Sequence, residues 1–424
     1  MKFSILTFGC RVNQADSLSI ARDLAARGGE HSPPDAADVV LVNTCSVTSA
    51  AEQDARQAIR RLARQRPGRR IVVTGCYARR DPAALSALPS VHGVVEVHEA
   101  STACCGVVER DGRDLGDMPG SLSMHAPPAG VQPGFLGRTV AVVSVQNGCD
   151  SSCAYCVVPL VRGRSRSTPA REVVARLRFL EEAGFSEVIL AGVHLGSWGR
   201  DLEPRQSLTD LLAAVCGGSG RLRIRLSSIE PMDVTPEVED LLAASTVFAP
   251  HLHLPVQHAS DRVLGLMRRP YAFDTARRLF ERLRSRLPHA ALGTDLLVGF
   301  PGEEESDFRE LVNWLRDSPL SYAHAFPFSP RPGTPAASME PRVPGASVRD
   351  RLAAIRAESA RLQRRFSESQ VGRVLEALTT GDGTVALTGN YLKVRIPGGQ
   401  KRNERVLVRV ASAHPLLGEL ASHP

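Results

Sequence analysis

Three cysteines, Cys149, Cys153 and Cys156, form the pattern CxxxCxxC within the stretch QNGCDSSCAYCVVPLVRGRSR. Three or four residues of extended chain reach at most roughly 10 to 14 Å, so the three thiols are expected to wrap around one bound object. Structural zinc sites usually take four Cys or His ligands, and no second pair stands beside this one. Three thiolates suit a four-iron cluster with one iron left open for a small chelating ligand. The alternative is three unrelated core thiols, since unpaired cysteines are often buried.

The aromatic residue Tyr155 directly precedes the third cysteine. With it, the loop resembles the signature of the radical S-adenosylmethionine (SAM) enzymes. This resemblance implies that the open iron chelates the amino and carboxylate groups of SAM. It also implies that one electron from the cluster cleaves SAM to a 5′-deoxyadenosyl radical.

The first third of the chain repeats one pattern three times: a short β-branched run, a cysteine and a helical stretch. The runs FSILTFGC, DVVLVNTC and RIVVTGC end at Cys10, Cys45 and Cys76. Strands that alternate with helices predict a parallel sheet, in which ligands gather at the carboxyl ends of the strands. We therefore expect these thiols to meet at one sheet edge and to form a second three-cysteine cluster site. The other cysteines fit neither pattern and are expected to be core or incidental thiols: Cys104, Cys105 and Cys216.

A second series of strands and helices begins at about residue 138. Six β-rich runs alternate with helical stretches, namely TVAVVSV, EVILAGV, LRIRLSS, HLHLPVQ, ALGTDLLVGF and YAHAFPF. This order predicts an open or partial (βα)6 barrel, in which the chemistry lies on the loops after the strands. The CxxxCxxC loop follows the first of these strands directly. The predicted fold class is therefore α/β, with an N-terminal open parallel sheet domain and a central radical SAM barrel.

Other polar or flexible residues follow the later barrel strands. By resemblance to the radical SAM enzymes, the candidate SAM contacts are Tyr155, Gly192, Ser227, Glu230, Gln257 and Gly299. The family usually carries an acidic residue after the second strand, and the segment GVHLGSWG has none. The alternative for Ser227 or Glu230 is a helix cap, which is common at strand ends. His251 and His253 alternate along one strand, and we expect them to be packed or hydrogen bonded rather than metal ligands.

Composition marks the remaining domain boundaries. Residues 113–137 are rich in Gly, Pro, Asp and Ser, which is typical of a linker between a domain at 1–112 and a domain at 138–366. Beyond residue 367 the runs GRVLEAL, TVALTGNYLKVRI and ERVLVRVASA alternate apolar and polar residues, which predicts a small all-β module over 367–424. Such a module can bind RNA through phosphate contacts, and a purely structural cap is the alternative.

The chain has 424 residues, a net charge of +7 and 43% apolar residues, which fits about three domains and permits an acidic partner such as RNA. Candidate RNA contacts are the arginine-rich stretches 60–70, 79–80, 162–166 and 268–269, although a solvated helix face explains the first equally well. The sequence contains no run of eighteen apolar residues, so no membrane span is predicted. We interpret the start, MKFSILTFGC, as the first strand of a cytoplasmic protein, and nine cysteines fit a reducing compartment.

The three parts together resemble the methylthiotransferases, which end in a TRAM domain that contacts the substrate. The motifs that carry the resemblance are TFGCRVNQADS, VNTCSVT, TGCYA, CAYCVVPLVRGRSRS and FSPRPGTPA. The resemblance implies a transferase with two [4Fe–4S] clusters, SAM, and an electron donor such as flavodoxin or ferredoxin. One cluster, at Cys149, Cys153 and Cys156, would reduce SAM. The other, at Cys10, Cys45 and Cys76, would hold the sulfur, which a second SAM methylates.

Three short stretches, GCRVNQ, NTCSVT and GVHLG, most resemble the bacterial enzymes that modify C2 of N6-threonylcarbamoyladenosine beside the anticodon of tRNA. The expected partner is therefore a tRNA anticodon stem-loop. The C2–H bond has no useful acidity, and acid–base groups contribute only about 10² to 10⁴ in rate, so a radical is the remaining route. Alternatives within the family are isopentenyladenosine in tRNA and an aspartate of a ribosomal protein. An alternative of another class is a metal-stabilised RNA-binding protein without catalysis.

Overall fold

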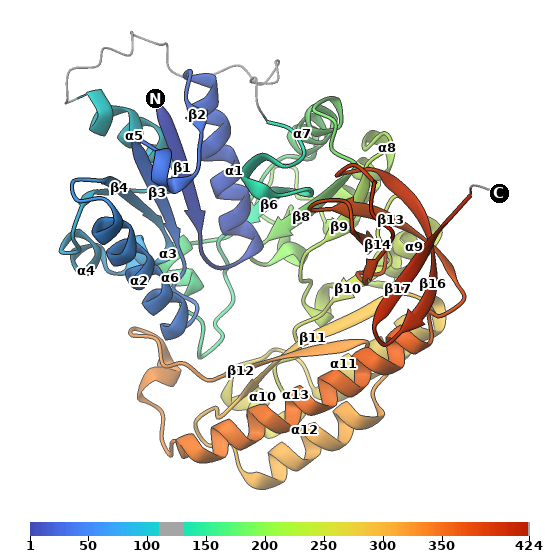
Figure 1. Cartoon of the computed structure of the whole chain (residues 1–424). Coiled ribbons are helices and arrows are strands. Elements are labelled where there is room, and N and C mark those ends of the chain that lie inside the picture. The colour runs from blue at the N-terminus through green and yellow to red at the C-terminus, as the bar shows by residue number, and fades with distance from the viewer. Residues whose placement is uncertain (110–130, 423–424) are drawn as a thin grey trace.

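The computed structural model describes residues 1–109 and 131–422 (Figure 1). The predicted linker at 113–137 lies outside the described residues as far as residue 130. The chain forms a parallel sheet at the N-terminus, an open barrel of parallel strands in the middle and a small closed β-barrel at the C-terminus. The predicted α/β fold class is therefore confirmed.

Parallel strands form the N-terminal sheet, in the order β2-β1-β3-β4-β5. Their bounds are β1 (Lys2–Thr7), β2 (Glu30–His31), β3 (Val39–Thr44), β4 (Arg70–Gly75) and β5 (Val91–Val94). Helices α1 (Arg11–Ala26) and α5 (Ala100–Glu109) pack on one face, and α2 (Ser49–Gln65), α3 (Cys76–Arg80) and α4 (Pro82–Ser86) pack on the other. Every residue of β3 is buried because both faces are covered. Cys104 and Cys105 lie in the core on the α1 side, as expected.

The predicted barrel strands are all present in the middle of the chain: β6 (Ala141–Asn147), β8 (Glu187–Gly192), β9 (Arg223–Leu226), β10 (His251–His253), β11 (Ala291–Val298) and β12 (Tyr322–Pro327). Strands β6, β8 and β9 pair in parallel, as do β10, β11 and β12. A parallel bridge between Ile224 of β9 and Phe248, just before β10, and a backbone bond from Ile229 N to His253 O link the two groups. A short strand, β7 (Arg166–Ser167), pairs antiparallel with β6, so the barrel stays open.

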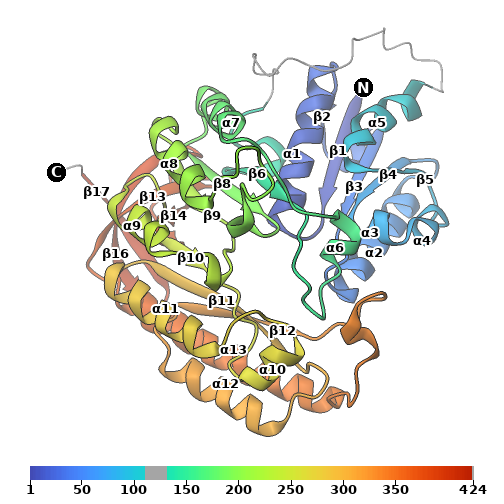
Figure 2. The ribbon, with the colours of Figure 1, turned by 180° about the vertical axis from the view of Figure 1, so that it is seen from behind.

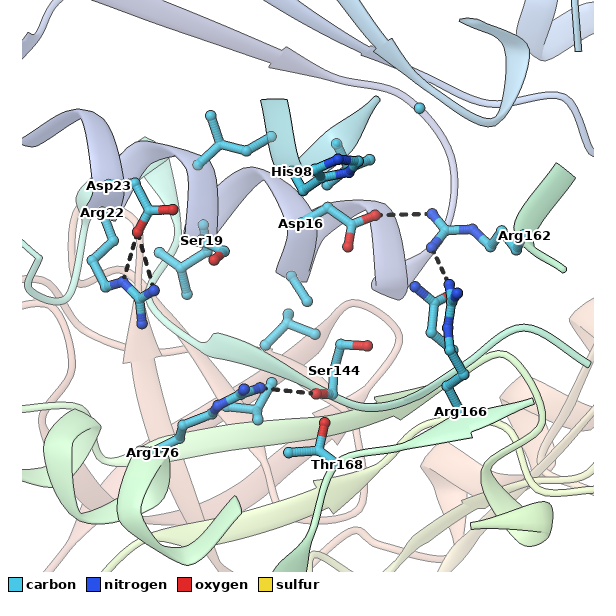
Figure 3. A pocket seen from close by; sticks show the side chains of 18 of the residues that line it. Asp16, Ser19, Arg22, Asp23, His98, Ser144, Arg162, Arg166, Thr168 and Arg176 are labelled. Atoms are coloured by element: carbon cyan, nitrogen blue, oxygen red, sulfur yellow. Dashed lines mark hydrogen bonds and ion pairs between the residues drawn. The ribbon is translucent and has the colours of Figure 1, made fainter. Parts of the chain in front are cut away.

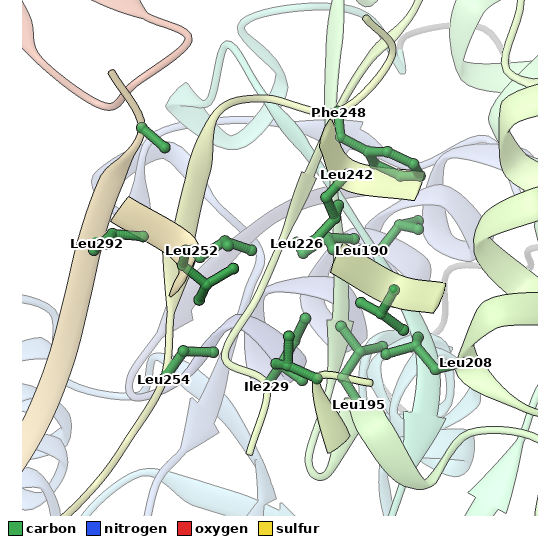
Figure 4. Close-up of a cluster of buried hydrophobic side chains, with 14 of the residues drawn as sticks. Leu190, Leu195, Leu208, Leu226, Ile229, Leu242, Phe248, Leu252, Leu254 and Leu292 are labelled. Atoms are coloured by element: carbon green, nitrogen blue, oxygen red, sulfur yellow. The ribbon is translucent and has the colours of Figure 1, made fainter. Parts of the chain in front are cut away.

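Helices surround these strands on their outer side: α7 (Ala170–Glu182), α8 (Leu208–Gly218), α9 (Pro236–Ala244), α10 (Asp261–Leu266), α11 (Phe273–Arg286), α12 (Glu305–Asp317) and α13 (Gly345–Glu368). The short helix α6 (Val158–Arg162) lies instead beside α3 of the N-terminal domain. Strand residues such as Leu190, Leu226 and Leu252 pack with helix residues in the largest core of the described chain (Figure 4). Because side chains alternate along a strand, the neighbours of Leu252, His251 and His253, point to the other face. That inner face lines a cavity.

The C-terminal part is a small closed barrel whose strands are β13 (Val374–Thr380), β14 (Val385–Thr388), β15 (Lys393–Arg395), β16 (Arg405–Ala413) and β17 (Leu416–Ala421). It lies beside the central barrel (Figure 2), and two arginines of β9 attach it there. Arg223 Nη1 donates to Glu376 O at 3.2 Å, and Arg225 Nη1 donates to Gly389 O at 2.9 Å. Both arginines are buried and paired with Glu187 of β8, so this contact is part of the folded core.

Apolar and charged contacts attach the N-terminal domain to the central barrel. Apolar residues of α1, Val12 and Ala15, pack on Val142 and Ile189 of the barrel strands. On the opposite side of the N-terminal sheet, Arg331 from the FSPRPGTPA motif forms a buried ion pair with Glu52 of α2. These contacts fix the cysteine-bearing edge of the N-terminal sheet relative to the barrel. In the described part of the chain, none of the helices combines the length and apolar character that a membrane crossing requires.

Candidate active site between two cysteine groups

The structure brings Cys10, Cys45 and Cys76 together at the carboxyl edge of the N-terminal sheet. Cys45 and Cys76 directly follow the neighbouring strands β3 and β4, and Cys10 lies three residues after β1. The Sγ atoms of Cys10 and Cys76 lie 3.8 Å and 3.9 Å from the same atom, Asn13 Oδ1. Gly9 leaves room for the third thiol, since a Cβ at this position would lie 2.6 Å from Cys45 Sγ.

The loop with Cys149, Cys153 and Cys156 is held by backbone contacts at both ends. Gly148 has a φ of +72°, and a Cβ there would lie 1.9 Å from Arg164 O, so only glycine permits this turn. Backbone bonds then clamp the loop, from Cys149 N to Gly163 O at 3.0 Å and from Ala154 N to Met267 O at 2.9 Å. The position of the three thiols is thus fixed by the fold around them.

Polar side chains contact two of the three loop thiols. His194 Nδ1 lies 3.7 Å from Cys149 Sγ, and its Nε2 lies 2.7 Å from Asp233 Oδ2. Burial raises the pKa of Cys149, but hydrogen bonds from His194 and Ser151 outweigh this effect, so the pKa lies below its ordinary value. Arg269 Nη1 lies 3.6 Å from Cys153 Sγ. The contacts of Cys149 favour its thiolate form, which is the form that binds metal.

The two cysteine groups are close neighbours. Arg162 of α6, only six residues after Cys156, donates from Nε to Cys76 Sγ at 3.1 Å. Val157 and Val161 pack against the same cysteine. Figure 2 shows α6 beside α3, the helix that begins with Cys76. One short segment therefore connects the cysteine loop of the barrel to the sheet-edge group.

The donor sets fit iron–sulfur clusters. Burial raises the pKa values of Cys45 and Cys156 to about 12, so these thiols are protonated at neutral pH when nothing is bound. A protonated thiol is a poor nucleophile, but a coordinating metal deprotonates it. In the described residues, no three Cys, His, Asp or Glu side chains converge as the ligands of a single metal ion. The thiolates of a four-iron cluster each bind a different iron, so they stand apart from one another.

Three of the candidate SAM contacts lie beside the cysteine loop. Gly192 N donates to Ser227 Oγ at 3.3 Å, which joins the ends of β8 and β9. Glu230 forms an ion pair with Arg269, the residue that reaches Cys153. Both strand ends therefore face the loop that carries the thiols.

The other three candidates make packing or backbone contacts. Tyr155, within the cysteine loop, packs edge-on against Phe300, with 6.4 Å between ring centroids. Gln257 has a left-handed φ of +74° and pairs through its backbone with β11. Gly299 lies against α13, because a Cβ there would lie 2.6 Å from Val348 Cγ2. Its left-handed φ of +76° also favours glycine at that position.

A cavity of about 410 Å³, which we call the inner cavity, lies where all three parts of the chain meet. Its wall includes residues of the N-terminal domain, the barrel strands and the C-terminal barrel: Cys10, Arg11, Ser227, His251, Tyr322 and Tyr391. It thus contacts the sheet-edge cysteine group at one side and the strand end beside the cysteine loop at another. As expected, the strand histidines are hydrogen bonded, with 2.8 Å from His251 Nε2 to Tyr322 Oη and from His253 Nδ1 to Ser228 Oγ.

A larger cavity of about 920 Å³ lies on the other side of α1, between α1 and the β6–α7 region (Figure 3). Cys76 is part of its wall, and the loop cysteines are not. Arg162 pairs there with Asp16, and Arg176 Nη1 donates to Ser144 O at 3.4 Å.

The sequence placed Arg162 and Arg269 in candidate RNA-binding stretches. This is wrong for these two residues, since both are buried beside cysteines.

Sequence reasoning missed four polar residues that contact the thiols: Asn13, Arg162, His194 and Arg269. Arg162 lies within the cysteine motif itself, and His194 lies in the segment where radical SAM enzymes usually carry an acidic residue. Their positions in the sequence therefore indicated a place near the cysteine groups. Their contacts with particular cysteines depend on long-range packing, which no local pattern contains.

Comparison with known proteins places these features in one family. Residues 2–96 match the uncharacterized protein family UPF0004, and residues 143–315 match the radical SAM superfamily. A threonylcarbamoyladenosine tRNA methylthiotransferase, MtaB, from Bacillus subtilis is 34% identical over 92% of this chain and 89% of its own length. A tRNA-2-methylthio-N(6)-dimethylallyladenosine synthase from Streptomyces viridosporus is 32% identical over 93% of this chain and 80% of its own length.

A solved structure shows the same fold. The radical SAM methyltransferase TsrM from Kitasatospora setae superposes with a TM-score of 0.55 over 79% of this chain and 74% of that chain, at 17% identity. At this identity the likeness concerns the fold alone. The sequence matches extend over nearly the whole length of this chain and of its relatives. The chain belongs to the radical SAM tRNA methylthiotransferase family.

Proposed function

We propose that this protein adds a methylthio group to C2 of N6-threonylcarbamoyladenosine beside the anticodon of tRNA. The observation that carries the proposal is the inner cavity, which has Cys10 in one wall and Ser227 in another. A base bound there would contact Cys10 of the sheet-edge group and Ser227 at the end of β9. The aromatic and cationic residues of the wall suit a purine that bears an anionic substituent. The printed name of the Bacillus subtilis relative gives this nucleoside as its substrate.

As a member of its family, the protein uses SAM and two [4Fe–4S] clusters. We propose that Cys149, Cys153 and Cys156 hold one cluster, and that Cys10, Cys45 and Cys76 hold the other. When bound, the first supplies the electron for the cleavage of SAM and the second supplies the sulfur for transfer. The chain's own contribution is to orient the thiols, through Asn13 and Arg162 at one site and His194 and Arg269 at the other.

We propose that residues at the strand ends bind SAM, namely Gly192, Ser227, Glu230 and Gln257, with Tyr155 and Gly299 shaping the surrounding wall. Ser227 already accepts a hydrogen bond from Gly192 and lies in the wall of the inner cavity. Glu230 is held by Arg269, so its carboxylate has a fixed orientation toward the cysteine loop. Buried groups with fixed orientation bind a polar ligand with little loss of conformational freedom.

The proposed macromolecular partner is the tRNA anticodon stem-loop, contacted by the C-terminal barrel, which we interpret as a TRAM-like domain. Small β-barrels bind RNA through phosphate contacts. The proposed electron donor is a flavodoxin or ferredoxin. We propose the cytoplasm as the place of action, because tRNA and such donors are found there together.

The test uses anaerobically reconstituted protein with SAM, a reductant and tRNA that carries N6-threonylcarbamoyladenosine. Mass spectrometry of the digested nucleosides is expected to show its 2-methylthio derivative. Methylthiolation of dimethylallyladenosine alone, or of a ribosomal-protein aspartate with unchanged tRNA, would assign the protein to another branch. Colourless protein that contains zinc and does not cleave SAM would favour a metal-stabilised RNA-binding protein.

A further inference from the structure

We propose that Arg11 binds the carboxylate of the threonylcarbamoyl group and thereby selects nucleosides with an anionic substituent. This inference rests on the proposed function. It assigns substrate specificity to one side chain of the inner cavity, next to the cysteine group at the sheet edge. Arg11 is the first residue of α1 and directly follows Cys10, so any group that it holds lies beside that cysteine.

Arg11 has no carboxylate partner of its own within the described part of the chain. Its Nη1 donates to Gln14 Oε1 at 3.1 Å, and its Nη2 donates to Tyr391 Oη at 2.9 Å. Both partners are neutral, and the side chain is half-buried. A guanidinium in this position keeps unused donors and an uncompensated charge. Both are satisfied by an anionic ligand in the cavity.

The other arginine of the cavity is already paired. Arg225 Nε donates to Glu187 Oε1 at 2.8 Å, and its terminal nitrogens donate to carbonyls of the C-terminal barrel. Asp295 lies with its Oδ1 3.1 Å from His253 Nε2. Arg11 is therefore the cation available to a ligand among the described residues of the wall.

The wall beside Arg11 is flat and aromatic. The rings of His251 and Tyr391 stack with 4.4 Å between centroids and 28° between planes. His251 and Tyr322 are nearly parallel, at 4° and 6.0 Å. Such surfaces bind bases that have been taken out of a helical stack. A volume of about 410 Å³ is within the range for a small-molecule site.

His251 also has an unused polar atom in this wall. Only 6% of His251 is exposed, and its Nδ1 has no hydrogen-bond partner in the described structure. Burial, together with the positive charges of Arg225 and Arg11, holds its pKa well below the ordinary value, so the ring is neutral. A buried polar atom without a partner is rare and is expected to meet a ligand or water.

Tyr391 is held in place to meet Arg11. It adopts a left-handed φ of +70°, which is strained for a side chain of this size. The preceding Asn390 anchors the turn by donating to Gln370 Oε1 at 3.0 Å and to His289 O at 3.1 Å. Arg11 is thus oriented from a different domain by a turn whose conformation is fixed.

The two substituents named for the relatives differ in charge. A threonylcarbamoyl group carries a carboxylate, and a dimethylallyl group is a hydrocarbon. An unpaired guanidinium attracts the carboxylate of the threonylcarbamoyl group. A bound dimethylallyl group would instead exclude water from the guanidinium and offer it no partner. Arg11 can therefore discriminate between them by attraction and by the cost of burying an unpaired charge.

The experiment measures binding and turnover of three stem-loop RNAs by the reconstituted protein. They carry N6-threonylcarbamoyladenosine, its analogue with a carboxamide in place of the carboxylate, and dimethylallyladenosine. The native protein is expected to prefer the carboxylate to the carboxamide by about tenfold to a hundredfold in Kd and in kcat/KM. Arg11→Gln is expected to remove this preference. Arg278→Gln, which removes an exposed arginine of α11, is the control and is expected to retain it.

Tyr391→Phe provides a second test, because it removes the hydroxyl that orients Arg11 and leaves the cysteine segment unchanged. It is expected to reduce the preference severalfold while iron content stays constant. If Arg11→Gln loses iron, the Tyr391 variant decides the question. An undiminished carboxylate preference in the iron-loaded variants would overturn the role of Arg11. Failure of the native protein to methylthiolate the first RNA would instead refute the proposed function.

Discussion

Arg162 Nη2 lies 2.9 Å from Asp16 Oδ2, and both side chains are almost completely buried. The arginine belongs to α6, just after the cysteine loop of the barrel, and the aspartate belongs to α1 of the N-terminal domain. The same guanidinium donates to Cys76 Sγ. This ion pair therefore helps to hold the two cysteine groups next to each other.

Replacement of Arg162 by Met is expected to destabilise the protein by about 3 to 5 kcal/mol, because Asp16 is left buried without a partner. The double variant with Asp16→Asn is expected to recover part of this loss. Arg164→Met, which removes an exposed arginine nearby, is the control and is expected to cost at most about 1 kcal/mol. Anaerobic urea unfolding measures the free energy of unfolding of each variant. Equal losses of this free energy in the single and double variants would contradict the role of the ion pair.

The buried carboxylate of Glu187 is expected to make the fold sensitive to acid. Burial raises its pKa, but Arg225 and Arg223 outweigh this effect, so the pKa lies below its ordinary value of 4.5. A carboxylate with a lowered pKa stabilises the fold above the unfolded pKa and loses this contribution as pH falls through the folded value. Urea unfolding from about pH 7 to about pH 3 is expected to show a steeper loss for the native protein than for Glu187→Gln. Glu182→Gln, at an exposed position, is the control, and identical slopes for native protein and Glu187→Gln would refute the prediction.

Glu52 is expected to be essential for the attachment of the N-terminal domain to the barrel. Its carboxylate accepts from Arg80 at 2.8 Å and 2.9 Å and pairs with the buried Arg331 of the barrel. Glu52→Gln leaves Arg331 without a counter-charge, which is expected to cost about 3 to 5 kcal/mol. Thermal unfolding and the rate of limited proteolysis measure the loss. Glu281→Gln, in an exposed helical pair, is expected to cost only about 0.5 kcal/mol, and a similar small cost for Glu52 would contradict the prediction.

Gly293 of β11 provides the space that the ring of Tyr322 occupies. A Cβ on Gly293 would lie 2.1 Å from this ring, so Gly293→Ala must displace it from the wall of the inner cavity. The expected cost in stability is about 1 to 3 kcal/mol. We also expect weaker turnover of RNA, while cleavage of SAM in the absence of RNA persists. Gly265→Ala in α10, where a Cβ meets no neighbour, is expected to gain up to about 1 kcal/mol, and unchanged RNA turnover in the Gly293 variant would refute the prediction.

The fold could be predicted from the sequence because its signals are local. β-branched runs followed by cysteines marked β1, β3 and β4, and parallel topology alone placed Cys10, Cys45 and Cys76 at one edge. The spacing CxxxCxxC indicated the other group. The first inference needed only the order of the strands, and the second needed only the spacing of the cysteines.

The polar surroundings of the thiols could not be predicted, because they join residues far apart in the chain. Arg11 and Tyr391 are 380 positions apart and meet only when three domains assemble. Arg162 and Arg269 were interpreted as surface charge, because composition does not distinguish a buried arginine from an exposed one.

Iron content per chain, measured after anaerobic reconstitution, tests most directly whether the two cysteine groups hold separate clusters. The native protein is expected to bind about eight iron atoms. The triple alanine variants at Cys10, Cys45 and Cys76, and at Cys149, Cys153 and Cys156, are each expected to bind about four. Full iron content in either triple variant would contradict the assignment of that group.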